Sequence, residues 1–266
     1  QESRGLGDVY KRQRREYLIQ YLLKEEIRVG SQNIPTDKQG QENLLRSLMN
    51  VRPPRPISND FLKIQDEYLA ERNIERGITD AAALAPVRSD SRLYIWQGDI
   101  TTLKCDAIVN ACNSQMLGCF SPMHACIDNF IHTYAGIELR LKMHEIMTEQ
   151  GHEEETGKAK ITSGYNLPAK YILHTVGPII QWKVTKKDED LLASCYTECL
   201  KLAADTGVES IAFCCLSTGV FRFPQQRAAE IATNTVKQYL NKDSRIKKVI
   251  FNVFKDEDLK IYSGLL

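Results

Sequence analysis

The sequence lacks the features that direct a protein to a membrane, to export or to a polyanion. No run approaches the roughly 18 consecutive apolar residues of a membrane-spanning helix, and no charged-then-apolar signal segment opens the chain. The formal net charge is only +1 over 266 residues. We therefore expect no membrane and no nucleic acid among the partners, and a cytoplasmic location.

Disulfide bonds are not expected either, although the chain holds eight cysteines. Without an export signal these thiols meet a reducing compartment. Four of them lie in apolar helical or strand patterns and are expected in the core, because free cysteine packs as a small hydrophobe. These four are Cys195, Cys199, Cys214 and Cys215.

Composition divides the chain into three segments. Residues 1–13 start with Gln rather than Met and have no apolar period, so we interpret them as a non-native leader and exclude them from the fold. Residues 14–90 show helical spacing and predict a helical N-terminal extension, with Asn59 or Asp60 capping its third helix. Its apolar stripes are narrow, which predicts packing on a neighbouring domain rather than a core of its own.

Residues 91–266 alternate between strand and helix patterns, which predicts an α/β domain with a largely parallel central sheet. Such sheets bind ligands outside the carboxyl ends of their strands. The loops after Trp96, Val109 and Leu216 are therefore the candidate ligand-binding loops. The predicted strands cover residues 93–96, 107–110, 159–164, 171–176, 211–216 and 248–253, and the predicted helices cover 127–147, 191–206 and 225–240, with a short one from 256.

The loop after the second predicted strand carries Cys119, His124 and Cys126 within eight residues. Three soft ligands from one loop suit a zinc ion whose fourth position stays open, as in zinc sites that perform chemistry. The alternative is two core thiols beside a surface imidazole. Among the other histidines, His174 lies inside a predicted strand, where a hydrogen-bonded core role is expected.

Three further loops offer polar groups at the edge of the predicted sheet where the parallel strands end. Asp99 could accept from a nucleobase amine or simply cap a turn. Asn110 and Asn113 could bridge backbone turns, or one could reach sugar hydroxyls. The segment 217–224 joins a strand to a helix through a glycine-containing turn, which suits a phosphate, although it is neither a Walker loop nor a G-x-G-x-x-G motif.

Taken in order, these motifs resemble a macrodomain, the ADP-ribose-binding fold, from about Arg92 to the C-terminus. The resemblance implies a three-layer α/β/α domain with a mixed, largely parallel sheet. Where many macrodomains carry a run of glycines, this chain has the segment 118–126. That segment and the helical extension are similar to the zinc-dependent macrodomains of bacteria and fungi, which remove ADP-ribose from proteins. The motifs are Gly98–Thr101, Asp106–Asn113, Gly157–Ala159, Gly164–Lys170, His174–Pro178 and Ser217–Gly219.

The resemblance also implies a role for each matching residue. Asp99 would contact the adenine amine, with Ile100 beside it, and Asn113 would lie near the distal ribose as a catalytic group together with the zinc ligands. The zinc ligands would be Cys119, His124 and Cys126, and the diphosphate loop would be Ser217, Thr218, Gly219, Val220 and Phe221, with Phe221 flanking the distal ribose.

The implied activity is zinc-dependent hydrolysis that removes mono-ADP-ribose from modified proteins. The ion could lower the pKa of a bound water, or act as a Lewis acid on a ribose hydroxyl or the linkage oxygen; two thiolates favour the second role. Two alternatives remain: an ADP-ribose reader with a structural zinc, and an O-acetyl-ADP-ribose deacetylase. A fourth protein ligand, His132 or Asp128, would favour the reader. Asp128 could instead orient His124 or cap the following helix.

The expected partners are a mono-ADP-ribosylated protein and ADP-ribose itself. Members of the zinc-dependent group often work beside a sirtuin-type ADP-ribosyltransferase and a lipoyl-carrier protein, so the resemblance makes these two further partners plausible.

Overall fold

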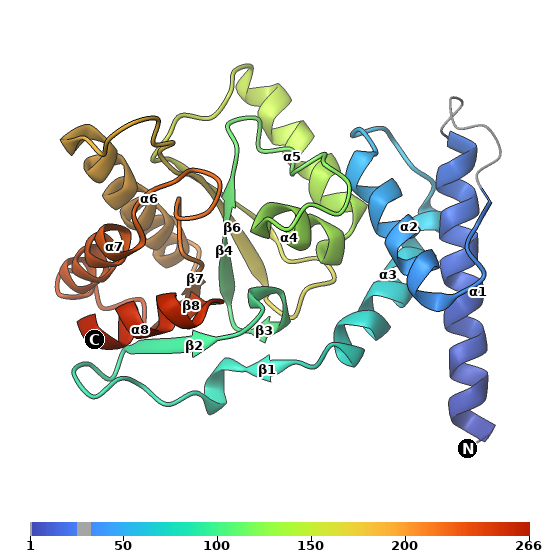
Figure 1. The fold of residues 1–266 in the computed structure, drawn as a ribbon, viewed down its shortest axis with the longest axis horizontal. Helices are drawn as coiled ribbons and strands as arrows, with labels where there is room; N and C mark the ends of the chain where they lie inside the picture. The colour runs from blue at the N-terminus through green and yellow to red at the C-terminus, as the bar shows by residue number, and fades with distance from the viewer. Residues whose placement is uncertain (1, 26–32) are drawn as a thin grey trace.

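The computed structural model describes residues 2–25 and 33–266 and shows a helical extension beside a layered α/β domain (Figure 1). The extension consists of α1 (Glu2–Glu25), α2 (Lys38–Val51) and α3 (Asn59–Glu75). Residues 2–13 continue α1, and Arg14 joins that helix to α3 through ion pairs with Glu67 and Glu71 at 3.0 and 2.9 Å. The interpretation of residues 1–13 as a non-native leader stays a prediction.

The extension has a small apolar core of its own, so the prediction that its stripes pack only on a neighbouring domain was wrong. The three narrow stripes face one another, and Ile137 of the α/β domain joins them. The third helix is capped by Ser58, whose hydroxyl accepts from the Phe61 N–H at 3.2 Å, and not by Asn59 or Asp60. The buried members are Leu18, Ile19, Leu22, Leu45, Leu48, Met49, Phe61, Tyr68 and Leu69.

A six-stranded sheet forms the centre of the α/β domain, in the order β2-β8-β7-β4-β6-β5. All neighbouring pairs are parallel except β5 with β6, which confirms the mixed, largely parallel sheet. The strands are β2 (Leu93–Gln97), β4 (Ala107–Cys112), β5 (Ala159–Ser163), β6 (Tyr171–Val176), β7 (Ser210–Phe213) and β8 (Lys248–Val253). A separate two-residue pair, β1 (Thr79–Asp80) with β3 (Leu103–Lys104), is too short to show a sequence period.

Helices cover both faces of this sheet and complete three layers. In Figure 1, α4 (Ile127–Ala135) and α5 (Ile137–Gln150) lie between the sheet and the extension. On the other face lie α6 (Lys186–Asp205), α7 (Gln225–Leu240) and α8 (Asp256–Leu265). No helix in the described ranges is both long and apolar enough to cross a membrane.

The single helix expected over residues 127–147 is two helices, because Gly136 breaks it. Its φ of 106° is a conformation that side-chain-bearing residues rarely adopt. A Cβ at this position would also lie 2.7 Å from the amide nitrogen of Gln65 on α3. The Gln65 side-chain oxygen accepts from the Ile137 N–H at 2.8 Å, so the extension contacts the α/β domain at this break.

A buried polar chain crosses the sheet under the α4 side. Asn110 on β4 lies opposite His174 on β6, with its Nδ2 atom 3.2 Å from Nδ1 of the ring, and Thr162 on β5 is 3.0 Å from Nε2. An amide that donates to Nδ1 leaves the proton of a neutral imidazole on Nε2. The hydrogen-bonded core role expected for His174 is therefore confirmed.

We predict that His174 contributes to acid sensitivity. Burial lowers its pKa to about 3, so below pH 6.5 the unfolded chain binds a proton that the folded chain does not. The free energy of unfolding should then fall by about 1.4 kcal/mol per pH unit from this group as the pH drops from 6.5 toward 3. His174→Gln lacks the titrating ring, so its stability deficit relative to the wild type should shrink over that range. Urea unfolding at several pH values measures it.

His152→Gln, which removes an exposed histidine outside the sheet, is the control for the loss of a histidine ring. A deficit for His174→Gln that stays constant between pH 7 and pH 4.5 would contradict the prediction.

Candidate functional site

The carboxyl ends of β2, β4, β6, β7 and β8 meet at one edge of the sheet because these strands are parallel. After β4 the chain continues to β5 and β6 on one side of it, and after β7 it continues to β8 on the other side. The neighbours β4 and β7 therefore form a topological switch point, where open α/β sheets bind their ligands. The loops that follow them contain Asn113 and Ser217.

The loop from β4 to α4 brings Cys119, His124 and Cys126 together. Their ligand atoms all lie within 4.8 Å of one another, and the Cys119 Sγ is 3.6 Å from Nδ1 of His124. Zinc–sulfur and zinc–nitrogen bonds at a tetrahedral angle would separate two such ligand atoms by about 3.6 Å. The residues therefore fit a zinc ion, and the group lies near the surface, because His124 is exposed and the two cysteines are half-buried.

Cys126 is both a candidate metal ligand and the N-cap of α4. Its Sγ accepts from the Asn129 N–H at 3.4 Å and caps the start of α4. Burial raises the pKa of its thiol to about 12. A divalent cation beside the sulfur favours the thiolate that burial alone disfavours.

Asp128 and His132 lie outside the metal-ligating group. Asp128 accepts from Asn110 Nδ2 at 2.8 Å and is 3.5 Å from Nε2 of His132. Burial raises the pKa of Asp128 to about 6 and lowers that of His132 well below its ordinary value. The predictions that Asp128 orients His124 or caps the helix were wrong, because Cys126 caps the helix and the Asp128 carboxylate accepts from Asn110. Within the described residues, the group has three protein ligands.

The loop after β7 is shaped to expose backbone donors. Ser217 takes a left-handed conformation with φ 63°, and its carbonyl accepts from the Phe223 N–H at 2.9 Å. Among the described residues, no protein acceptor faces the N–H groups of residues 218–221, and the buried Ser217 hydroxyl also has no partner. These donors precede the N-terminus of α7, so the loop has the properties of an anion site.

Asp99 follows β2 and caps a short 3-10 turn, η2 (Ile100–Thr102). One carboxylate oxygen accepts from the Thr101 N–H and hydroxyl at 2.9 and 2.6 Å, which confirms the capping alternative. The other oxygen pairs with Arg76 at the end of α3, a contact that no sequence motif indicated. The Asp99 side chain remains 36% exposed, so a further partner can reach it. Ile100 beside it is buried.

Asn113 is exposed at the carboxyl end of β4, and Asn110 is not. The Asn113 side-chain oxygen accepts from the N–H groups of Gln115 and Met116 at 3.1 and 3.2 Å and so bends the chain toward the metal-ligating loop. Its Nδ2 atom donates to no protein group in the part of the chain that is described. Asn113 thus makes the backbone turn and retains two donor hydrogens for a ligand.

Comparisons with known proteins show the family of the chain. The family described as Macro domain matches residues 109–232. A protein of Treponema medium named "Protein-ADP-ribose hydrolase" is 57% identical over 257 residues, which cover 96% of this chain and 98% of that protein. A protein of Staphylococcus aureus (strain MRSA252) with the same name is 52% identical and covers 94% and 93%.

Solved structures show the same architecture. The Trypanosoma brucei macrodomain in complex with ADP-ribose superposes with a TM-score of 0.64 at 29% identity, over 83% of this chain and 94% of that one. The Oceanobacillus iheyensis macrodomain with ADP gives 0.58 at 38% identity, over 65% and 88%. The chain belongs to the macrodomain family. It is similar over nearly its whole length to the two bacterial relatives, whereas the Oceanobacillus structure covers a smaller part.

We predict that Gly177→Ala destabilises the loop after β7. A Cβ at Gly177, directly after β6, would lie 2.0 Å from the buried Ser217 hydroxyl oxygen, so the Ser217 side chain must rotate or the loop must shift. The expected loss in the free energy of unfolding is about 1–3 kcal/mol, measured by urea unfolding. Gly219→Ala is the matched control, because no atom lies within 4 Å of its Cβ position. Equal stabilities for the two variants would contradict the packing described here.

Proposed function

We propose that the protein is a zinc-dependent hydrolase that removes mono-ADP-ribose from modified proteins. The observation that carries the proposal is the group of Cys119, His124 and Cys126, which follows Asn113 at the switch point of the sheet. Three protein ligands are the number that zinc sites with an open fourth position use. The names of the relatives from Treponema medium and Staphylococcus aureus support the same activity.

The order of the loops along the sheet edge supports the position of each part of the ligand. Asp99 follows the edge strand β2, the segment 217–221 follows β7, and Asn113 follows the neighbouring strand β4. Adenine, diphosphate and distal ribose succeed one another in ADP-ribose in the same order. We propose that Asp99 accepts from the adenine amine, that Ser217, Thr218, Gly219, Val220 and Phe221 hold the diphosphate, and that Asn113 contacts the distal ribose.

The groups of this chain bind and orient the substrate. The free N–H groups of residues 218–221 fix the diphosphate, and the Nδ2 donors of Asn113 hold a ribose hydroxyl, so the anomeric carbon is carried toward the metal ligands. When bound, zinc supplies a Lewis acid that favours departure of the linked side chain. The thiolates of Cys119 and Cys126 reduce the net charge of that site, which favours the Lewis-acid role.

A reader with a structural zinc is less well supported, because a closed site needs a fourth protein ligand and both candidates lie elsewhere. The carboxylate of Asp128 binds Asn110, and His132 lies beside that carboxylate. A deacetylase acting on O-acetyl-ADP-ribose would use the same loops, and no contact favours it over the protein substrate.

We also propose an ADP-ribosyltransferase as a functional partner. A protein of Fusarium oxysporum f. sp. cubense named "Probable bifunctional ADP-ribose hydrolase/ADP-ribosyltransferase" is 42% identical over 84% of this chain, which spans 40% of that protein. A chain named for both activities supports the pairing. The sirtuin type of the transferase and the lipoyl-carrier protein rest on the resemblance alone.

Loss of a metal ligand should abolish activity without unfolding the domain. We expect Cys119→Ala and His124→Ala to reduce release of ADP-ribose from a mono-ADP-ribosylated protein by more than about a hundredfold, because the metal contributes several kcal/mol to the reaction. Elemental analysis reports zinc, and circular dichroism reports folding. Cys215→Ala removes a half-buried thiol outside the group and should retain activity. Undiminished release by a variant that has lost its zinc would refute a catalytic role for the metal.

Asp99 should discriminate adenine from a purine that lacks the exocyclic amine. A hydrogen bond to a charged acceptor contributes about 1.5–3 kcal/mol, so the wild type should bind ADP-ribose roughly tenfold to a hundredfold more tightly than the purine analogue. Asp99→Ala should abolish that preference, as measured by calorimetry with both ligands. The comparison separates base recognition from general effects of unpairing Arg76. A preference that survives the substitution would show the adenine assignment to be wrong.

A further inference from the structure

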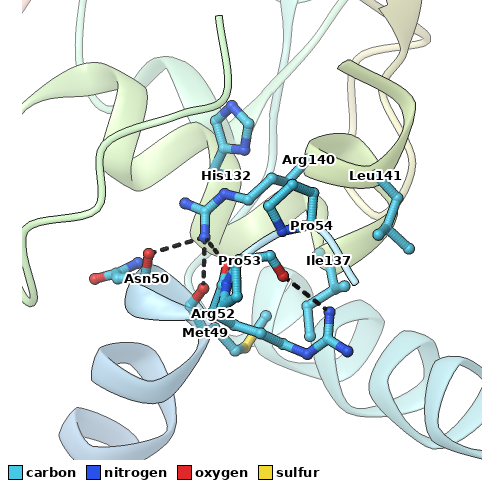
Figure 2. A pocket seen from close by; sticks show the side chains of 10 residues that line it. Met49, Asn50, Arg52, Pro53, Pro54, His132, Ile137, Arg140 and Leu141 are labelled. Carbon is cyan, nitrogen blue, oxygen red and sulfur yellow. Dashed lines mark hydrogen bonds between the residues drawn. The ribbon is translucent and has the colours of Figure 1, made fainter. Parts of the chain in front are cut away.

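The metal-ligating loop, residues 118–126, lies against α2 of the N-terminal extension. Figure 2 shows the Arg140 guanidinium of α5 pointing at the end of α2, in a cavity between the two units. Arg140 is 5% exposed and has no carboxylate within ion-pair distance among the described residues. Its donors bind main-chain carbonyls instead, as cations do at helix C-termini. The acceptors are Met49, Asn50 and Arg52 at 3.1, 2.8 and 2.7 Å.

The same guanidinium also holds the start of the loop. Its Nε donates to the Leu117 carbonyl at 2.7 Å, and a terminal nitrogen is 3.5 Å from the carbonyl of Cys119. It stacks on Phe120 with 4.1 Å to the ring centre. Arg140 therefore joins the end of α2 to the segment that carries the first metal ligand.

Asn50, the penultimate residue of α2, holds the middle of the loop. Its side-chain oxygen accepts from the Met123 N–H at 3.1 Å, and its Nδ2 donates to the Thr133 hydroxyl at 3.0 Å. Met123 has φ 58°, a conformation that residues with a side chain seldom adopt. The bond from Asn50 thus stabilises an unusual backbone immediately before His124.

Arg46, one turn earlier on α2, holds the second ligand directly. It donates to the main-chain carbonyl of His124 at 2.9 Å and to the side-chain oxygen of Asn129 at 2.7 Å, and it stacks on Phe130. Asn129 in turn donates from its amide to the Ser121 carbonyl at 2.9 Å and from its N–H to the Cys126 sulfur. Arg46 therefore contacts the backbone of His124 directly and is linked to Cys126 through Asn129.

We propose that Arg46, Asn50 and Arg140 are positioning residues that preorganise the three metal ligands, so that the N-terminal extension is a working part of the metal site. The inference rests on the proposed zinc site. Residues 118–126 have no helix or strand to order them, and ligands that are already ordered lose less conformational entropy on binding an ion. The polar partners of metal-ligating segments commonly set metal affinity in this way.

The test removes Arg46, which is half-buried at the edge of α2. Arg46→Ala should weaken zinc binding about tenfold to a hundredfold in competition with a chromogenic chelator. Arg46→Met retains an apolar stem over Phe130, removes the donors and their charge, and should show the same loss. Arg46→Lys keeps one cationic donor and should recover part of it. Calorimetry with ADP-ribose on the zinc-free proteins should give equal affinities, because the contacts proposed for adenine and diphosphate come from other loops.

Arg12→Ala is the matched control, since it removes an exposed arginine of the extension that pairs with Glu16 on the same helix. It should change neither affinity. Wild-type zinc affinity in both Arg46→Ala and Arg46→Met would overturn the proposal, even if hydrolysis fell. Equal losses of zinc and ADP-ribose affinity with a broadened unfolding transition would overturn it too, since that pattern reports general loosening. A wild-type chain that binds no zinc would overturn the proposed function and this inference with it.

Discussion

Parallel pairing of β4 with both β6 and β7 is the constraint on which the rest of the site depends. It sends the loops after these strands to one edge, and the opposite directions of the chain after β4 and β7 place a topological switch point between them. An exposed amide at Asn113 and backbone N–H groups after Ser217 that face no acceptor among the described residues lie on the two loops of that switch point. The fold therefore supplies N–H groups that can donate hydrogen bonds to an anion and to a hydroxyl group, independently of the metal-ligating loop.

The loop of residues 118–126 carries the proposed metal ligands, and it is held from two sides. On the α/β domain, Cys126 caps α4 and so couples one ligand to a rigid helix. On the extension, α2 binds the loop backbone at Met123 and His124. Arg140 ties the helix end to the loop start. The extension has its own apolar core, yet the polar side chains at the end of α2 contact the loop of the proposed metal ligands.

Much of this arrangement could be predicted from the sequence. Buried parallel strands appear as short apolar runs, so the sequence predicts the five parallel strands, and it also predicts the antiparallel edge strand β5. The three candidate metal ligands occupy one contiguous segment with a characteristic spacing. The break at Gly136 was missed because the apolar period continues through it. The extension's own core was missed because each helix shows a narrow stripe, and three stripes packed together are not visible in any one of them.

The contacts that support the loop lie beyond sequence reasoning for a different reason. Arg46 precedes its acceptor His124 by 78 residues, and Arg140 follows Asn50 by 90. Asp99 likewise pairs with Arg76 across two units. No spacing rule links such positions, and an arginine on a helix face is usually solvated. Asp128 shows the converse: its place beside Cys126 suggested a metal-related role, but its partner Asn110 comes from the sheet beneath it.

X-ray absorption spectroscopy at the zinc edge of the purified protein, with and without ADP-ribose, tests the central claim most directly. An open site predicts two sulfur ligands at about 2.3 Å with nitrogen and oxygen ligands near 2.0–2.1 Å, and a change confined to the light-atom shell when ADP-ribose is added. A closed set of protein ligands with a spectrum that ADP-ribose leaves unchanged would contradict it.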